Sequence, residues 1–272
     1  MKTTQITIWI VLLLAVFPAV LRAQSKDRDQ FNIALSNPGK PFKLNMNLGG
    51  GSVNINTYEG SELHVTAFPQ ANTNANSGQG KNQNVNININ TNVNVNVNSG
   101  AAGGNTNRNR LLKVSQNGNE IVIAQLNKNR ALNVEVSLPE NVASQLEITC
   151  ADGPVVLKNI SGSAIVTTVN GNVTATFKNV DAKAPMAFST LIGAIDLSFP
   201  ATVKAKLTLK SEEGLLLSDF ALTGAVKSKL NRNKNGQYQS KLAGGLSAQL
   251  NGGGQEITIT NMQGNIYLRK HK

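Results

Sequence analysis

The sequence predicts an all-β protein, a single-domain β-solenoid, and three observations lead to this fold class. First, aromatic residues make up only 4% of the 272 residues, while β-branched residues are common, which favours strands around thin aliphatic layers. Second, a five-residue phrase, glycine-any-apolar-any-apolar, recurs along the chain. Third, the copies that begin at Gly153, Gly162 and Gly171 lie nine residues apart, a short regular spacing that is typical of stacked repeats.

The recurring phrase predicts which side chains face the core. Side chains alternate between the two faces of a strand, so the third and fifth positions of each copy point the same way. Glycine begins each copy because a tight turn needs a positive φ or a close backbone approach. The copies begin at Gly51, Gly153, Gly162, Gly171, Gly193, Gly244 and Gly264. We therefore expect Val155, Val173, Ile195 and Ile266 to be buried.

A β-sandwich of antiparallel hairpins also places strands at intervals of 8–12 residues, and it remains the alternative fold. The repeated interval of nine favours the solenoid. Pro185 and Pro200 predict strand ends, because proline cannot donate a hydrogen bond to a strand ladder.

Residues 1–23 have the pattern of a secretory signal peptide. Lys2 precedes an apolar run from Ile6 to Phe17, and Ala23 supplies the small residue before the expected cleavage. The run is shorter than the ~20 residues of a membrane-spanning helix. Cleavage removes Lys2 and Arg22, so the formal charge falls from +11 to +9. We expect an exported protein with no transmembrane segment after cleavage.

Residues 24–272 are expected to form one structural domain with three parts. Residues 24–69 carry short alternating apolar runs separated by turns, which predicts antiparallel N-terminal cap strands. Such a cap is needed because an open solenoid end exposes unpaired strand edges. Residues 110–272 form the solenoid repeats, interrupted by a polar segment at 227–241.

Residues 70–109 form an Asn-rich, low-complexity arm inserted between these parts. Its centre alternates asparagine with aliphatic residues, so one face of an extended segment carries a column of amides. Two interpretations remain open: a hydrogen-bonding surface for a ligand or for self-association, and an extended loop without a partner. The candidate surface consists of Asn84, Asn86, Asn88, Asn90, Asn92, Asn94, Asn96 and Asn98.

We expect no catalytic site, no metal site and no cofactor. His64 and His271 are the only histidines, and neither has a supporting motif for a catalytic triad. Cys150 is the only cysteine; it lies in an apolar alternation and is expected to be a small buried hydrophobe. Four aspartates on the repeats are candidates for glycosidase chemistry, which needs two facing acids, but they follow no paired pattern. They are Asp152, Asp181, Asp196 and Asp219.

The basic excess does not predict a nucleic-acid partner. Lysine and arginine are scattered along the chain, whereas a nucleic-acid surface clusters them with stacking aromatic residues. An anionic envelope surface or an acidic polysaccharide fits an exported basic protein better.

The repeats resemble a bacterial family of adhesin-like proteins, a domain of unknown function for which a β-solenoid is expected. The resemblance rests on glycine-and-apolar segments at 153–173, 189–200, 211–220 and 252–269, and on the strands around Gly51. It covers most of residues 31–270 outside the Asn-rich arm. These motifs specify a fold better than a function, and the resemblance identifies no binding residues in this chain.

The expected function is therefore that of a secreted or envelope-associated, non-catalytic, adhesin-like binding or structural protein. Expected partners are a glycan, a component of a cell surface or envelope, or further copies of the chain. Expected locations are the bacterial periplasm, the outer-membrane surface or the extracellular space. Two alternatives stay open: a polysaccharide-active enzyme on a β-helix, and an envelope scaffold or sensor partnered with a membrane protein.

Overall fold

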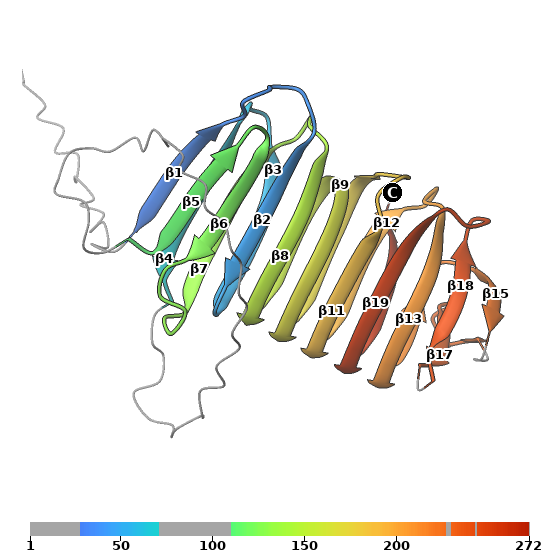
Figure 1. Ribbon diagram of the computed structural model, residues 1–272. Helices are drawn as coiled ribbons and strands as arrows, with labels where there is room; N and C mark the ends of the chain where they lie inside the picture. The colour runs from blue at the N-terminus through green and yellow to red at the C-terminus, as the bar shows by residue number, and fades with distance from the viewer. Residues whose placement is uncertain (1–27, 71–109, 227–229, 243, 272) are drawn as a thin grey trace, which may run out of the picture.

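The computed structural model describes residues 28–70, 110–226, 230–242 and 244–271, and these form twenty strands and no helix (Figure 1). The strands lie in two layers, which we call the front and back sheets, with the front sheet facing the viewer in Figure 1. In spatial order the front sheet contains β5 (Leu112–Asn117), β6 (Glu120–Gln125), β2 (Phe42–Leu48), β8 (Ser144–Asp152), the second half of β9 (Val155–Asn170), β11 (Met186–Ile192), β19 (Gln255–Gln263), β13 (Ala205–Glu213), β18 (Leu246–Leu250) and β15 (Leu222–Val226).

The back sheet follows the same axis. It contains β1 (Asp29–Ala34), β4 (Glu62–Pro69), β7 (Leu132–Pro139), β3 (Gly51–Tyr58), the first half of β9, β10 (Val173–Val180), β12 (Ile195–Pro200), β20 (Ile266–His271), β14 (Leu215–Ser218), β17 (Tyr238–Lys241) and β16 (Asn231–Arg232). Each coil runs along a front strand, turns, and returns along a back strand, and neighbouring coils pair in parallel. The predicted β-solenoid is confirmed.

The order of the coils differs from the order of the chain at two places. The β2–β3 coil lies between β6–β7 and β8–β9. The β19–β20 coil lies between β11–β12 and β13–β14. Segments distant in sequence are therefore hydrogen-bonded inside the stack on both sides.

Fewer strands of residues 24–69 belong to the antiparallel N-terminal cap than the sequence predicts. Antiparallel pairing joins β1 to β4, β4 to β7 and β5 to β6. In contrast, β2 and β3 pair in parallel with their neighbours. They form an ordinary coil, because a glycine turn links this front strand to its back strand as in the other coils. The opposite end has antiparallel strands as well: β18 pairs with β13 and β15, and the β16–β17 hairpin, which lies in the polar 227–241 segment, pairs with β14.

The core consists of the predicted inward positions. Val155, Val173, Ile195 and Ile266 are each 0% exposed. The fifth positions of the same copies are buried too, and so are both apolar positions of the copies at Gly51, Gly162 and Gly244. Three phenylalanines thicken the centre, where the Phe177 ring stacks on Phe199 at 5.3 Å and meets Phe188 edge-on at 6.1 Å.

The nine-residue interval corresponds to half a coil. Gly153 and Gly171 lie at the same corner, because the backbone of Gly153 is the nearest contact of a Cβ added at Gly171. Gly162 lies at the opposite corner, where a Cβ would meet the carbonyl oxygen of Ser144. A complete coil in this part of the chain therefore takes two copies of the phrase.

A column of glycines forms one corner of the solenoid. A Cβ added at Gly171 would lie 2.1 Å from the carbonyl oxygen of Gly153, and one at Gly193 would lie 2.2 Å from that of Gly171. The column continues in the same way from Gly193 to Gly264 and from Gly264 to Gly214. No side chain fits here, because successive backbones approach too closely.

A row of buried polar side chains runs beside the glycine column. Thr168, Thr190, Ser211 and Asn261 each precede a column glycine by three residues and are at most 3% exposed. Each donates a hydrogen bond to a glycine carbonyl of its own or a neighbouring coil. The Thr190 Oγ1–Gly171 O distance, for example, is 3.0 Å.

Candidate functional site

The most unusual surface feature is an apolar area in the middle of the front sheet. Six large hydrophobic side chains are exposed among the described residues, and five of them lie on β9, β11 and β19, which are side by side in Figure 1. We call these five the front patch: Ile165, Val169, Leu191, Ile192 and Met262, with exposed fractions of 42–49%. Natural surfaces seldom gather exposed apolar side chains in this way without a binding role.

Strand register brings Val169, Leu191 and Met262 of the front patch together. Thr168 pairs with Thr190 and Asn170 with Ile192, so Val169 lies beside Leu191. Leu191 in turn lies between the registered pairs Thr190–Asn261 and Ile192–Gln263, which places it beside Met262. Neighbouring strands are ~4.8 Å apart, so these side chains are in mutual contact range.

The front patch is also free of charge. The segments 163–170, 186–192 and 257–263 contain no acidic or basic residue. Outward side chains between the apolar ones are short hydroxyls such as Thr167, Ser189 and Thr260. Charges begin on the adjoining strands: Glu147 of β8 pairs with Ile165 and forms an ion pair with Lys43. On the other side, Lys210 and Glu212 of β13 form an ion pair beside β19. An uncharged, apolar centre with a polar surround is the composition of a protein–protein contact.

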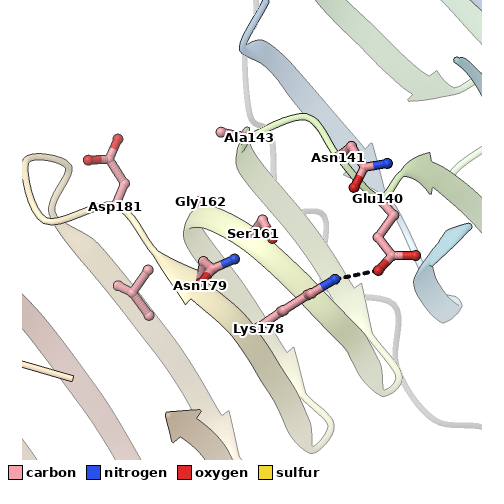
Figure 2. A pocket seen from close by; sticks show the side chains of 9 residues that line it. Glu140, Asn141, Ala143, Ser161, Gly162, Lys178, Asn179 and Asp181 are labelled. Atoms are coloured by element: carbon pink, nitrogen blue, oxygen red, sulfur yellow. Dashed lines mark hydrogen bonds and ion pairs between the residues drawn. The ribbon is translucent and has the colours of Figure 1, made fainter. Parts of the chain in front are cut away.

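A cleft of about 420 Å³ lies at the corner opposite the glycine column (Figure 2). At this corner β9 turns tightly through Asn159, with φ 57°, and Gly162, with φ 128°, whereas its neighbours use longer loops. Those loops project on both sides and leave a notch above the β9 turn. An ion pair between Lys178 and Glu140 spans the notch, and the Asp181 side chain points away from it. A second cleft lies beyond Asn179 and Val180, which line both.

The four candidate aspartates lie in three places, because Asp196 and Asp219 are both near Arg269. Asp152 borders the glycine column, whereas the Asp181 amide donates to the Gly162 carbonyl at the opposite corner. The Asp196 carboxylate accepts a bifurcated hydrogen bond from the single N–H of Arg269 Nε, with N–O distances of 2.8 and 2.9 Å.

The fourth aspartate lies near the same arginine, because the hydrogen bond to Asp196 and the charges of both Asp196 and Asp219 raise the pKa of the Arg269 guanidinium. Asp219 accepts hydrogen bonds from Gln237 Nε2 at 2.8 Å and from the Lys270 amide at 3.2 Å.

The histidines and the cysteine occupy structural positions. His64 lies 2.7 Å from the Tyr58 hydroxyl and 2.8 Å from Asn32 Oδ1. His271 ends β20, and its Nε2 lies 2.5 Å from the Phe177 carbonyl oxygen. Cys150 is fully buried, as predicted, and burial raises the pKa of its thiol to about 11.

The Asn-rich candidate surface lies outside the described residues. The structure shows where the arm is attached: the chain leaves after β4 and returns before β5, at the cap end of the solenoid. In the described ranges no group of three or more potential metal ligands occurs. No helix in those ranges has the length and hydrophobicity to cross a bilayer.

The front patch was missed in the sequence, although a signal for it exists. An outward position in an alternating strand is usually polar, yet the apolar residues Ile165, Val169 and Leu191 occupy outward positions, each next in sequence to a buried residue. The repeat phrase specifies only inward positions, so apolar residues between them carry information about the surface.

Comparisons with known proteins agree with the fold. A family model described as Toastrack DUF4097 matches residues 32–269. A solved structure, that of a "putative cell adhesion protein" from Clostridium sporogenes ATCC 15579, superposes with a TM-score of 0.52 at 15% identity. The superposition covers 90% of this chain and 99% of that one. No curated protein matches the chain. The resemblance noted in the sequence is thereby confirmed, and the chain belongs to the Toastrack family of domains of unknown function.

Proposed function

We propose that the chain is an exported, non-catalytic binding protein of the bacterial envelope, which holds a protein partner on the front patch. The observation that carries this proposal is the grouping of five exposed apolar side chains on three adjacent, uncharged strand segments. Burying apolar surface contributes about 25 cal/mol per Å², so a partner that covers these strands gains affinity without having to desolvate charges.

The architecture supports a role in contact. A solenoid presents a long, regular outer surface on which neighbouring coils add to one binding area. The solved structure of similar fold is that of a "putative cell adhesion protein", which agrees with an adhesin-like role. The apolar segment at residues 6–17 supports export. A non-catalytic role agrees with the engagement of Asp196 and Asp219 by protein donors, Arg269 and Gln237 respectively.

The proposal is tested by placing a charge in the front patch. The mature chain and its Leu191→Lys and Met262→Lys variants are labelled and incubated with intact bacterial cells. Thr208→Lys is the control, because Thr208 is exposed on β13 of the same sheet but lies outside the patch. We expect both patch variants to lose at least tenfold in affinity, while the control binds like the wild type.

Melting temperatures must accompany these measurements, because the argument requires folded variants. Unchanged cell binding by folded Leu191→Lys and Met262→Lys proteins would overturn the proposal. Sedimentation of the same proteins identifies the partner class: a wild-type dimer that the patch variants abolish makes a second copy the partner.

A further inference from the structure

The strands on either side of the front patch are equally far from β11. Counting from β11 in the front sheet, β8 is the second strand on one side and β13 is the second strand on the other (Figure 1). Strand register aligns one row of outward residues across these five strands: Glu147, Ile165, Ala187, Thr258 and Thr208. Glu147 and Thr208 therefore lie at the same distance from Ala187, about 10 Å at the usual strand spacing.

The two ends of this row carry opposite charges. Glu147 is the acidic end, and its side chain is 53% exposed. At the other end, Lys206 and Lys210 lie on either side of Thr208 on the outward face of β13, and the Lys210 side chain is 57% exposed. Glu147 and Lys210 each form an ion pair within the chain, but exposed pairs contribute little, so both groups can take a stronger partner.

A two-fold axis parallel to β11 and passing above Ala187 would bring these opposite ends together. The rotation lays β8 of one copy of the chain on β13 of another, and β9 on β19. Glu147 of each copy then faces Thr208 of the other copy, between Lys206 and Lys210. A two-fold contact is self-complementary, so this attraction occurs twice.

The same rotation brings no like charges of these strands together. Lys43 of β2 would face Gln249 of β18, because each lies one row before Glu147 and Thr208 on the third strand from β11. Glu212 of β13 would face Ala151 of β8. An axis across the strands would instead set Lys210 against its own copy, because Lys210 shares the central row of the front patch with Ser189. The charges therefore favour the axis that runs along the strands.

The centre of the front patch also matches itself under this rotation. Val169 of β9 would face Met262 of β19, and Leu191 would face its own copy, so apolar side chains meet apolar side chains. Thr167 would face Thr260, and a hydroxyl both donates and accepts a hydrogen bond, so two hydroxyls can satisfy each other. The absence of charge matters for contact between copies, because the chain has a formal net charge of +11 and most of its surface repels a second copy.

The area of the matching surface suits a reversible dimer. Five strands spaced by ~4.8 Å, with seven residues each at ~3.3 Å, cover about 500 Å² of sheet. Two copies would thus bury about 1,000 Å² in total, which is near the lower limit for a specific interface. A contact of this size forms and dissociates with concentration.

We propose that the front patch is the contact surface of a reversible homodimer whose two-fold axis runs parallel to β11. The inference rests on the proposed function, because it names the protein partner of the same patch as a second copy of the chain. Contacts of this kind would join copies exported by one cell or by neighbouring cells.

Sedimentation equilibrium of the mature chain over a wide concentration range tests the dimer. We expect a monomer–dimer equilibrium that Leu191→Lys abolishes. Circular dichroism melting of each variant shows that the loss does not come from unfolding. A wild-type chain that stays monomeric at millimolar concentration, or a dimer that Leu191→Lys leaves intact, would overturn the inference.

Exchanging the facing charges tests the orientation. Glu147→Lys should weaken the dimer at least fivefold, and adding Lys210→Glu should restore most of the lost affinity. Within one chain the two residues are four strands apart, about 19 Å, so the rescue must act between copies. Glu147→Lys with Lys158→Glu is the matched control: it has the same net charge, but Lys158 is exposed on the back sheet, and no affinity should return. Equal rescue by the two second substitutions would overturn the arrangement.

The cell-binding assay separates this inference from the proposed function. If the chain is monomeric but Leu191→Lys still loses its binding to cells, a different protein occupies the front patch and only the homodimer is wrong. If the dimer and the charge rescue are observed but Leu191→Lys binds cells like the wild type, the homodimer stands and the envelope role is wrong.

Discussion

Asn261 and Ser211 lie opposite each other on β19 and β13, and both side chains donate to the carbonyl oxygen of Gly264. The two Nδ2–O and Oγ–O distances are 2.8 and 3.3 Å. Thr168 and Thr190 bond the carbonyls of Gly153 and Gly171 in the same manner. At this corner the backbones of successive coils approach closely, so the glycine carbonyls point into a region closed to solvent. The buried side chains supply the hydrogen-bond donors that these carbonyls need.

Removing one of these donors should weaken the stack measurably. Thr190→Val keeps the side-chain shape but loses the hydroxyl that bonds Gly171 O and Ile192 O. We expect a loss of about 1–2 kcal/mol in the free energy of unfolding, because the carbonyls stay buried without this donor. Urea denaturation measures it. Thr208→Val is the control, because Thr208 is exposed on the front strand β13. It should change stability by less than about 0.5 kcal/mol. Equal losses in both variants would contradict the role given to the buried row.

The glycine column makes a stronger prediction. In Gly171→Ala the added methyl would meet the Gly153 carbonyl oxygen at 2.1 Å, and no rotation of a side chain can relieve this contact. We expect a loss of about 3 kcal/mol, the upper part of the range for overpacking. Gly236→Ala is the control: its φ is +78°, but nothing lies within 4 Å of the added atom. That variant should lose only roughly 1 kcal/mol from backbone strain. Because Gly171 itself has no positive φ, a loss no larger than that of Gly236→Ala would contradict the crowding between coils.

The sequence predicts the coil interior well because one rule governs it. Alternation determines that Val173 and Ile195 face inward, and the glycine before each phrase marks a corner. The inward face of each strand must be apolar wherever the strand lies in the stack, so the rule needs no knowledge of neighbours. Cys150 was predicted as buried on the same ground.

The order of coils and the surface sites could not be predicted in this way. Every coil has the same interior pattern, so alternation cannot reveal that β19 enters between β11 and β13. The front patch depends on register across strands from different parts of the chain, which places Leu191 beside Met262. Local patterns carry no information about such pairs.

Burial of the Cys150 thiol should make stability depend on alkaline pH. Burial raises the pKa of this group from 9.0 to about 11, so the folded protein favours the protonated form. Below pH 9 the thiol is protonated in both states and its contribution is complete. Between pH 9 and about 11 the unfolded chain ionises first, so stability falls as the pH rises, by roughly 2–3 kcal/mol in total.

Other groups titrate in the same range, so the measurement is a difference. Urea denaturation of the wild type and of Cys150→Ala at pH 8 to 11 should give stability curves that converge at high pH. A thiol reagent at pH 8 should react with the wild type only after denaturation. Parallel stability curves, or rapid labelling of the native protein, would show that the thiol is accessible.

A charge introduced on the inward face of a strand should destabilise the protein far more than the same charge on the outward face. Ile195 is fully buried between the sheets, whereas Ile165 is 43% exposed on the front patch. Ile195→Asp places a carboxylate where no water or cation can solvate it, and we expect the protein to unfold. Ile165→Asp puts the same group on the surface and should cost less than about 1 kcal/mol. Circular dichroism melting of both variants gives the comparison. Because the substitution is identical, a folded Ile195→Asp protein with a wild-type Tm would mean that the back-sheet strands do not pack against the front sheet as described.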